Sequence, residues 1–280
     1  MRSRAAQPPG RNASTAATVA SWACPCSKRP SCSGRWAGRS DTMTASTPPQ
    51  SGPLPTVLLA GATGLVGQQL LRLLAQDDGI GHVRALMRRP ATLAQWLPAP
   101  LTARLAPGKV SLPVVDFDQL ATHSELFRAD WVFCALGTTI RQAGSQAAFR
   151  KVDFDYPLQV ARLARAQGAQ RFLLVSAVGA SARSRVFYSR VKGELEDAVR
   201  ALGFESVTFA QPSTLIGDRA DVRPGERLAL KLGFLTPAAY KPVHDWQVAQ
   251  GLWRAAHEGR PGVHTLDNIS MRRQKQPQMG

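Results

Sequence analysis

Residues 56–67 read TVLLAGATGLVG, an apolar run followed by a glycine-rich turn. The apolar run predicts a short buried strand. The turn has the spacing G-x-x-G-x-x-G, and apolar side chains recur at helical spacing over residues 64–76 behind it. A strand, a glycine turn and a helix in this order are typical of the first unit of a nucleotide-binding α/β sheet.

Glycine suits this turn because the chain must bend tightly, let its backbone approach a pyrophosphate, and pack the helix close to the sheet. The helix N-terminus then offers free N–H groups and the positive end of its dipole to the phosphates. An ordinary strand-to-helix turn also uses glycine and is the alternative. We predict that a nicotinamide cofactor binds here, against Gly61, Thr63, Gly64, Leu65, Val66 and Gly67.

Apolar runs and helical patterns alternate along the rest of the chain. Strands are predicted at 83–87, 112–115, 131–135, 172–175 and 206–210, and helices at 146–167, 184–202 and 245–258. This alternation predicts an α/β fold, a doubly wound, Rossmann-like parallel sheet with helices on both faces. A short C-terminal region is expected to supply a substrate lid.

The expected domain organisation has three parts. Residues 55–270 form the NAD(P)-binding domain, with the lid at 211–245, and residues 271–280 form a basic tail. Residues 1–54 lack apolar periodicity, so we expect a disordered basic leader. A start at Met43 would make residues 1–42 dispensable, whereas an Arg- and Ser-rich leader also resembles an organelle transit peptide.

Composition excludes several classes of protein. The chain has 280 residues, 44% hydrophobic and 19% charged, which fits a globular domain. No apolar run reaches the roughly 18 residues that a membrane span needs. The formal net charge is +16, but no basic stripe interleaves with aromatic residues, so we expect small anionic ligands and no nucleic acid.

The cysteines predict neither disulfides nor a metal site. Four cysteines are too few for a disulfide scaffold of this length, which favours a reducing, cytoplasmic compartment. Cys24, Cys26 and Cys32 have no histidine nearby and make a poor zinc set. Cys134 lies inside an apolar run, so we interpret it as a core residue rather than a nucleophile.

The end of the second predicted strand indicates the type of cofactor. NAD sites place a carboxylate about 20 residues after the glycines, where it accepts from the ribose 2′-hydroxyl. Here Arg88 and Arg89 follow the strand, and Asp77 and Asp78 lie at its other end. Two guanidinium groups favour a 2′-phosphate and hence NADP(H). A pair of solvated surface arginines is the alternative.

Two further strand ends are predicted to contact the cofactor, because open α/β sheets bind ligands outside the carboxyl ends of their strands. Asp116 and Phe117 would hold the adenine, although Asp116 would equally suit a helix N-cap. The small-residue turn of Leu136, Gly137 and Thr138 is expected beneath the cofactor.

Three side chains are placed to act on a carbonyl group. Tyr188 and Lys192 are four residues apart and share a helix face, and Ser176 ends the preceding strand. A free phenol has a pKa of about 10, and an ammonium within about 4–6 Å favours the phenolate. Tyr188 would be the acid/base. Lys192 would lower the pKa of Tyr188 and bind the ribose, and Ser176 would orient the carbonyl oxygen. An ordinary surface pair on a helix is the alternative.

Together these motifs resemble the atypical short-chain dehydrogenase/reductases of the NAD(P)-binding Rossmann superfamily, most closely the Tat-interacting oxidoreductase-like subgroup. The resemblance covers about residues 55–265 and rests on the glycine turn and on 136–139 (LGTT), 152–156 (VDFDY), Ser176, 188–194 (YSRVKGE), 211–213 (QPS) and 217–219 (GDR). It implies that Ser176, Tyr188 and Lys192 are the catalytic trio, and that Gln211, Pro212 and Ser213 lie near the nicotinamide. The Asn-Ala-Gly usual after the fourth strand is absent, and Asp153 is the positional candidate for the family's proton-relay asparagine.

The sequence therefore predicts an NADPH-dependent oxidoreductase that transfers hydride to a small carbonyl substrate, as a monomer or homodimer. One alternative is an NADPH-binding regulatory module that binds a protein partner without turnover. Another is a sugar-nucleotide epimerase, which the short region after residue 217 disfavours. Fold alone does not separate these functions.

Overall fold

The structure is a computed structural model that describes residues 53–217 and 237–274. Residues 1–52 of the predicted leader, 218–236 of the predicted lid and 275–280 of the predicted tail lie outside the described residues. The proposed leader, lid and tail therefore stay predictions. In the described part, no helix is long and apolar enough to cross a membrane.

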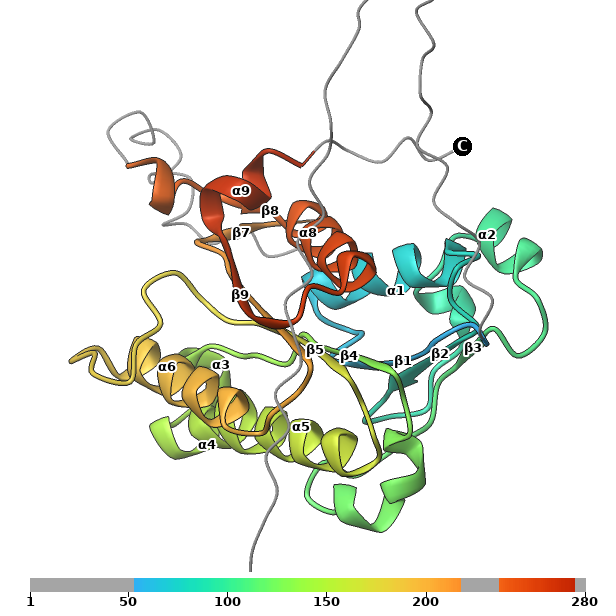
Figure 1. Cartoon of the computed structure of the whole chain (residues 1–280), viewed down its shortest axis with the longest axis horizontal. Coiled ribbons are helices and arrows are strands. Elements are labelled where there is room, and N and C mark those ends of the chain that lie inside the picture. The colour runs from blue at the N-terminus through green and yellow to red at the C-terminus, as the bar shows by residue number, and fades with distance from the viewer. Residues whose placement is uncertain (1–52, 218–236, 275–280) are drawn as a thin grey trace, which may run out of the picture. The chain divides into compact units, whose positions relative to one another are not determined.

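The described chain is built on a parallel sheet in the order β3-β2-β1-β4-β5-β6-β9, which confirms the doubly wound prediction (Figure 1). Its strands are β1 (Thr56–Ala60), β2 (His82–Leu86), β3 (Val110–Ser111), β4 (Trp131–Cys134), β5 (Arg171–Val175), β6 (Ser206–Gln211) and β9 (Gly262–Asp267). The strand order reverses at β1, which pairs with both β2 and β4. Ligands bind at this switch point in such sheets. A second, two-stranded sheet pairs β7 (Leu215–Ile216) with β8 (Val243–His244).

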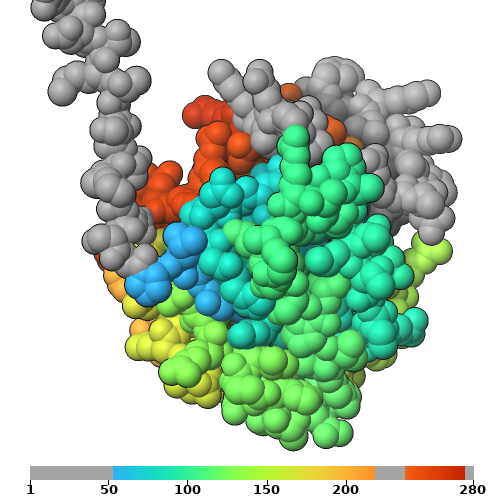
Figure 2. All heavy atoms as spheres, turned by 90° about the vertical axis from the view of Figure 1, so that its right-hand side faces the viewer, coloured from blue at the N-terminus to red at the C-terminus, as the bar shows by residue number. Residues whose placement is uncertain are grey.

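Helices cover both faces of the sheet. α1 (Leu65–Gln76) and α8 (Asp245–Glu258) pack together on one face, while α5 (Tyr156–Ala166) and α6 (Phe187–Arg200) cover the other (Figure 1). The shorter helices are η1 (Leu93–Gln95), α2 (Ala99–Arg104), η2 (Leu120–Phe127), α3 (Ile140–Ala143), α4 (Gln146–Arg150), the π-helical η3 (Lys151–Asp155), η4 (Ala238–Tyr240) and α9 (Asn268–Arg272). Figure 2 views the molecule from the side of β3, where the earlier, blue-to-green part of the described chain makes up most of the surface.

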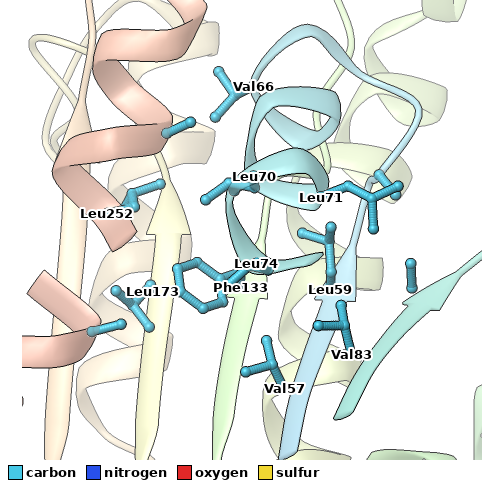
Figure 3. Close-up of a cluster of buried hydrophobic side chains, with 14 of the residues drawn as sticks. Val57, Leu59, Val66, Leu70, Leu71, Leu74, Val83, Phe133, Leu173 and Leu252 are labelled. Carbon is cyan, nitrogen blue, oxygen red and sulfur yellow. The ribbon is translucent and has the colours of Figure 1, made fainter. Parts of the chain in front are cut away.

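Two hydrophobic cores follow from the alternation of side chains along the strands. Val57, Leu59 and Phe133 lie on the face covered by α1 and α8 and belong to one hydrophobic cluster with Leu70 and Leu252 (Figure 3). Their neighbours in sequence point to the opposite face, and that core contains Leu58, Val132, Phe172, Leu195 and Val199. Strands buried on both faces explain why their sequences are continuous apolar runs rather than alternating patterns.

The third strand was wrongly placed at residues 112–115. β3 is Val110–Ser111, and beyond it only an isolated bridge joins Met87 to Val114. Pro113 explains the shift, because proline has no N–H to donate to a regular ladder. The Pro113 carbonyl still accepts a hydrogen bond from the Met87 N–H, at 2.9 Å.

Two predicted helices also differ from those in the structure. The helix predicted from residue 184 begins at Phe187, because the preceding residues loop back against α6, where a Cβ on Gly193 would overlap the backbone of Ser181. The helix predicted over 146–167 contains the π-helical turn η3 between α4 and α5. Turns of this kind are rare and recur at functional sites. The edge strand β9 was not predicted at all.

Asp77 links the two helices of one face at the end of the sheet away from the glycine turn. Its carboxylate accepts a hydrogen bond from the Trp253 indole at 2.7 Å and lies 2.6 Å from Nε2 of His257, and both partners belong to α8. Burial would raise the pKa of Asp77, but the hydrogen bonds from His257, Trp253 and the Gly79 N–H outweigh it and lower the pKa below 3.8.

A lowered carboxyl pKa predicts how stability depends on pH. The carboxylate stabilises the fold above its unfolded pKa of about 3.9, and this contribution is lost as the pH falls through the folded pKa. We expect Asp77→Asn to lower the thermal midpoint at about pH 6, and the difference from wild type to shrink as the pH is lowered from there through the folded pKa of Asp77. Asp78→Asn, an exposed neighbour, is the control. A difference that is constant over this range would contradict the assignment.

Candidate cofactor and active site

The glycine turn brings three parts of the chain into close contact. Gly61 has φ of 91°, a left-handed conformation that favours glycine, and a Cβ there would lie 2.6 Å from the backbone of Ala135 after β4. A Cβ on Gly67 would overlap the carbonyl group of Gly61. No side chain caps the N-terminus of α1 at Gly64. A tight turn and an uncapped helix N-terminus are the features that bind phosphate groups.

A pocket of about 450 Å³ opens at the carboxyl ends of β2 and β3. Its lining residues are Arg88, Val114, Val115, Asp116, Phe117, Val152 and Tyr156. Both predicted phosphate-binding arginines are exposed; Arg88 lines the pocket, whereas Arg89 is not among the lining residues. The Asp116 carboxylate also accepts a hydrogen bond from the Asp118 N–H at 2.9 Å, so a turn-stabilising role accompanies its place in the pocket.

One wall of this pocket is held by contacts between the turn after β3 and the start of α5. The Phe117 ring packs 5.4 Å from the Tyr156 ring. The Tyr156 hydroxyl donates to Asp118 at 2.8 Å, and Lys151 pairs with the same carboxylate at 2.7 Å. Burial and Asp118 together raise the pKa of Tyr156, so its hydroxyl remains a donor at neutral pH.

The turn after β4 lies directly over a buried ion pair. Nζ of Lys192 lies 2.8 Å from Oδ1 of Asp153, and the two side chains are 4% and 1% exposed. The Thr138 N–H donates to the other oxygen of Asp153 at 2.8 Å. The ideal Cβ position on Gly137 lies 3.4 Å from Asp153 and 3.7 Å from the Lys192 ammonium, which places this turn in van der Waals contact with the ion pair.

The ion pair keeps the lysine charged. Burial alone would lower the pKa of Lys192, but the charge of Asp153 and a hydrogen bond to this carboxylate outweigh burial and raise that pKa. Asp153 comes from the π-helical turn η3, which directs it into the interior. The sequence identified Asp153 only by its position in a family motif, and the structure places it on Lys192.

Tyr188 lies in the first turn of α6, one helical turn before Lys192. Its ring packs 5.6 Å from that of Phe149, which is fully buried, and the tyrosine itself is partly exposed. The structure thus brings the tyrosine and the lysine to one side of the helix, with the Lys192 ammonium beside the Gly137 turn. A partly exposed tyrosine one helical turn from a buried ammonium can exchange a proton with a ligand and then with solvent.

The third predicted member of the trio, Ser176, has a different immediate partner. Its hydroxyl donates to the buried carboxylate of Glu196 at 2.5 Å. Gln211, predicted to lie near the nicotinamide, donates its side-chain amide to the same carboxylate at 2.9 Å. The sequence interpretation missed Glu196. A charged residue four positions after Lys192 on an amphipathic helix was the signal that could have found it.

Of the other predicted residues near the nicotinamide, Ser213 contacts the C-terminal segment. Pro212 is buried, and the Ser213 hydroxyl donates to the Lys241 carbonyl at 2.5 Å while its N–H donates to Asn268 at 3.0 Å. Cys134 is a core residue, as predicted, and burial raises the pKa of its thiol to about 12. No cluster of three or more potential metal ligands occurs in 53–217 and 237–274.

Comparison with known families agrees with this geometry. The sequence pattern of a family described as NAD(P)H-binding matches residues 61–252. The chain belongs to this NAD(P)H-binding family. The match begins at the first glycine of the turn and extends through α6 into α8, so the family shares the elements that form the candidate site.

Curated relatives of this NAD(P)H-binding protein confirm the predicted subgroup. Protein HTATIP2 of Rattus norvegicus is 37% identical over 63% of this chain and 69% of its own length. The mitochondrial protein fmp52 of Emericella nidulans is 32% identical over 63% of this chain and 73% of its own length.

Solved structures with similar folds include proteins with NAD bound. MoeE5 in complex with UDP-glucuronic acid and NAD has a TM-score of 0.57 at 18% identity, covering 75% of each chain. DesIV, a dTDP-glucose 4,6-dehydratase from Streptomyces venezuelae with NAD bound, has a TM-score of 0.57 at 18% identity, covering 75% of this chain and 74% of its own. At this identity the likeness establishes the Rossmann-like fold and no more.

Proposed function

We propose that this NAD(P)H-binding protein is an NADPH-dependent reductase of a small carbonyl compound, with Tyr188 as its proton donor. The observation that carries the proposal is the arrangement of Tyr188 and Lys192 on one side of α6, with the lysine held charged by Asp153 beside the turn after β4. Membership of an NAD(P)H-binding family supports the cofactor part of the proposal.

The residues at the site fit a dinucleotide. The pyrophosphate would lie on the glycine turn and the uncapped start of α1, and Lys192 would reach the ribose next to the nicotinamide. The adenine would enter the pocket bordered by Asp116 and Phe117, and the 2′-phosphate of the adjoining ribose would lie at Arg88 and its neighbour in sequence, Arg89. When bound, the nicotinamide supplies the hydride that reduces the substrate carbon.

The side chains of this chain supply the proton. As the carbonyl carbon gains a hydride, its oxygen becomes an alkoxide, and Tyr188 donates the phenolic proton that turns it into an alcohol. The Lys192 ammonium stabilises the tyrosinate left behind, since an opposite charge nearby favours the charged form. Asp153 fixes that ammonium under the Gly137 turn. Tyr188 then recovers a proton from solvent, because it is partly exposed.

The choice of NADPH over NADH gives a separate prediction. We expect wild type to bind NADPH more tightly than NADH, and Arg88→Ala to lose about 10- to 100-fold in NADPH affinity, because a charge-assisted hydrogen bond contributes about 1.5–3 kcal/mol. NADH affinity should change little. Arg89→Ala should have a smaller effect, and the exposed Arg104→Ala, from α2, is the control. Equal affinities of wild type for the two cofactors would contradict the proposal.

The reaction itself is tested by a panel of aldehydes and ketones with NADPH, in single-turnover experiments on wild type and Tyr188→Phe. Consumption of NADPH by wild type alone would support reduction. Tight NADPH binding without NADPH oxidation by any compound of the panel would instead favour the alternative of a non-catalytic regulatory module. Conversion of sugar nucleotides would favour the epimerase alternative.

The relatives also bear on location. The fmp52 relatives are named as mitochondrial proteins. That name favours the organellar alternative for the basic leader over a cytoplasmic location, and we propose that residues 1–54 direct the chain to an organelle.

A further inference from the structure

Glu196 is a buried carboxylate in the helix that carries the proposed catalytic pair. It lies two helical turns after Tyr188 and one turn after Lys192, so the three residues lie along one side of α6. Glu196 is buried, with only 2% of the residue exposed to solvent. It accepts hydrogen bonds from the Ser176 hydroxyl, the Gln211 amide and the Arg200 guanidinium, the last at 3.1 Å.

Two of these donors stand at the carboxyl ends of adjacent strands. Ser176 directly follows β5, and Gln211 is the last residue of β6. The strands are paired, and the Ser176 N–H donates to the Ala210 carbonyl at 2.7 Å. Ligands of open α/β sheets bind outside such strand ends. Glu196 therefore fastens α6 to both strand ends that border the proposed reaction site.

The hydrogen bond to Glu196 limits what Ser176 can do. A serine hydroxyl has a single proton and otherwise only lone pairs. While that proton is donated to Glu196, the oxygen of Ser176 can accept but not donate. A substrate carbonyl oxygen is itself an acceptor, so it needs a donor from elsewhere. Turning the hydroxyl away would leave a buried carboxylate with one fewer donor, which is unfavourable.

We propose that Glu196 is a positioning residue of the site, which holds Ser176 and Gln211 at the ends of β5 and β6, and that Tyr188 rather than Ser176 donates to the substrate oxygen. The inference rests on the proposed reductase function and revises the role that the sequence assigned to Ser176. Ser176 then acts through Glu196, so removal of either partner should disturb the same contact.

The test is a double-mutant cycle of Ser176→Ala and Glu196→Gln, with kcat, KM, the NADPH dissociation constant and the thermal midpoint measured for each variant. Glutamine preserves the shape of Glu196, so the variant keeps the packing of the core. We expect each single change to lower kcat about tenfold, the loss of roughly one charged hydrogen bond. The kcat of the double variant should be within about twofold of the kcat of the less active single variant.

Arg200→Ala is the matched control, because Arg200 is the third partner of Glu196 but is 39% exposed and also pairs with Asp197 on the outer side of α6. It should lower the thermal midpoint and leave kcat within about twofold. If the two tenfold losses instead multiply, kcat of the Ser176→Ala/Glu196→Gln double variant falls about a hundredfold. That result would show that Ser176 contacts the substrate independently, and would overturn the inference. A fall in thermal midpoint without a fall in kcat would overturn it as well.

The cycle also separates failure of this inference from failure of the reductase proposal. If no carbonyl compound is reduced by wild type, the reductase proposal fails, and the NADPH dissociation constants then decide the inference. Glu196→Gln and Ser176→Ala should weaken NADPH binding without adding to each other, because both loosen the strand ends beside the nicotinamide site. Additive losses, or none, would overturn it.

Discussion

Tyr188→Phe is expected to lower the rate of NADPH-dependent reduction by about 100- to 10,000-fold while NADPH affinity stays close to that of wild type. A positioned general acid contributes about this much to a rate. The phenol hydroxyl interacts most strongly with the developing alkoxide, so its loss affects the transition state more than the bound ground state. Phenylalanine keeps the ring that packs against Phe149, so the fold should be unaffected.

The measurements are single-turnover NADPH oxidation, an NADPH titration and the thermal midpoint. Tyr156→Phe is the matched control, because it also removes a single tyrosine hydroxyl. That hydroxyl donates a hydrogen bond to Asp118 at the proposed adenine pocket, away from the proposed reaction site. This variant should change the rate less than Tyr188→Phe. Turnover of Tyr188→Phe at the wild-type rate would show that another group protonates the substrate, and the proposed mechanism would be wrong.

The parts of the fold that the sequence predicted correctly have a strong local signal. The strand at 56–60, the glycine turn and α1 were predicted within a residue because apolar runs and glycine spacing follow directly from backbone geometry. The helix at 245–258 was predicted with its observed bounds, Asp245–Glu258. Its apolar residues recur at helical spacing, and Gly259, which ends it, has φ of 54°.

The errors arose where the apolar pattern alone does not determine the backbone structure. Pro113 lies in a β-like run and interrupts the ladder that this run would otherwise join. β9 (GVHTLD) is a largely exposed edge strand, so it lacks the apolar run that identified the central strands. The π-helical turn η3 does not alter the apolar pattern of the helix that contains it, and the sequence predicted one continuous helix there.

The candidate site shows the same division. Tyr188 and Lys192 were predicted from a spacing of four residues, a local property of a helix. The contacts of this helix come from distant segments: Asp153 reaches Lys192 from η3, and Gln211 reaches Glu196 from β6. A single sequence gives no pairing between residues so far apart. The positions of these carboxylates therefore became apparent only from the folded chain.

The pair of Lys192 and Asp153 leads to the largest expected effect on stability. Lys192→Met removes the ammonium and leaves a carboxylate that is 1% exposed without its charged partner. Breaking a buried ion pair from one side costs about 3–5 kcal/mol. We therefore expect this loss in the free energy of unfolding, measured by urea denaturation without cofactor, together with loss of reduction and weaker NADPH binding.

A second variant separates the charge from the shape of the site. Lys192→Met/Asp153→Asn removes both charges, and the asparagine oxygen can still accept the hydrogen bond that the Thr138 N–H donates to Asp153. Replacing a buried pair by neutral groups of similar volume is often close to neutral in stability. The double variant should therefore regain most of the lost stability without regaining turnover, because the ammonium that stabilises tyrosinate is still absent. A double variant as unstable as Lys192→Met would show that packing of the lysine chain, rather than the unpaired charge of Asp153, causes the loss.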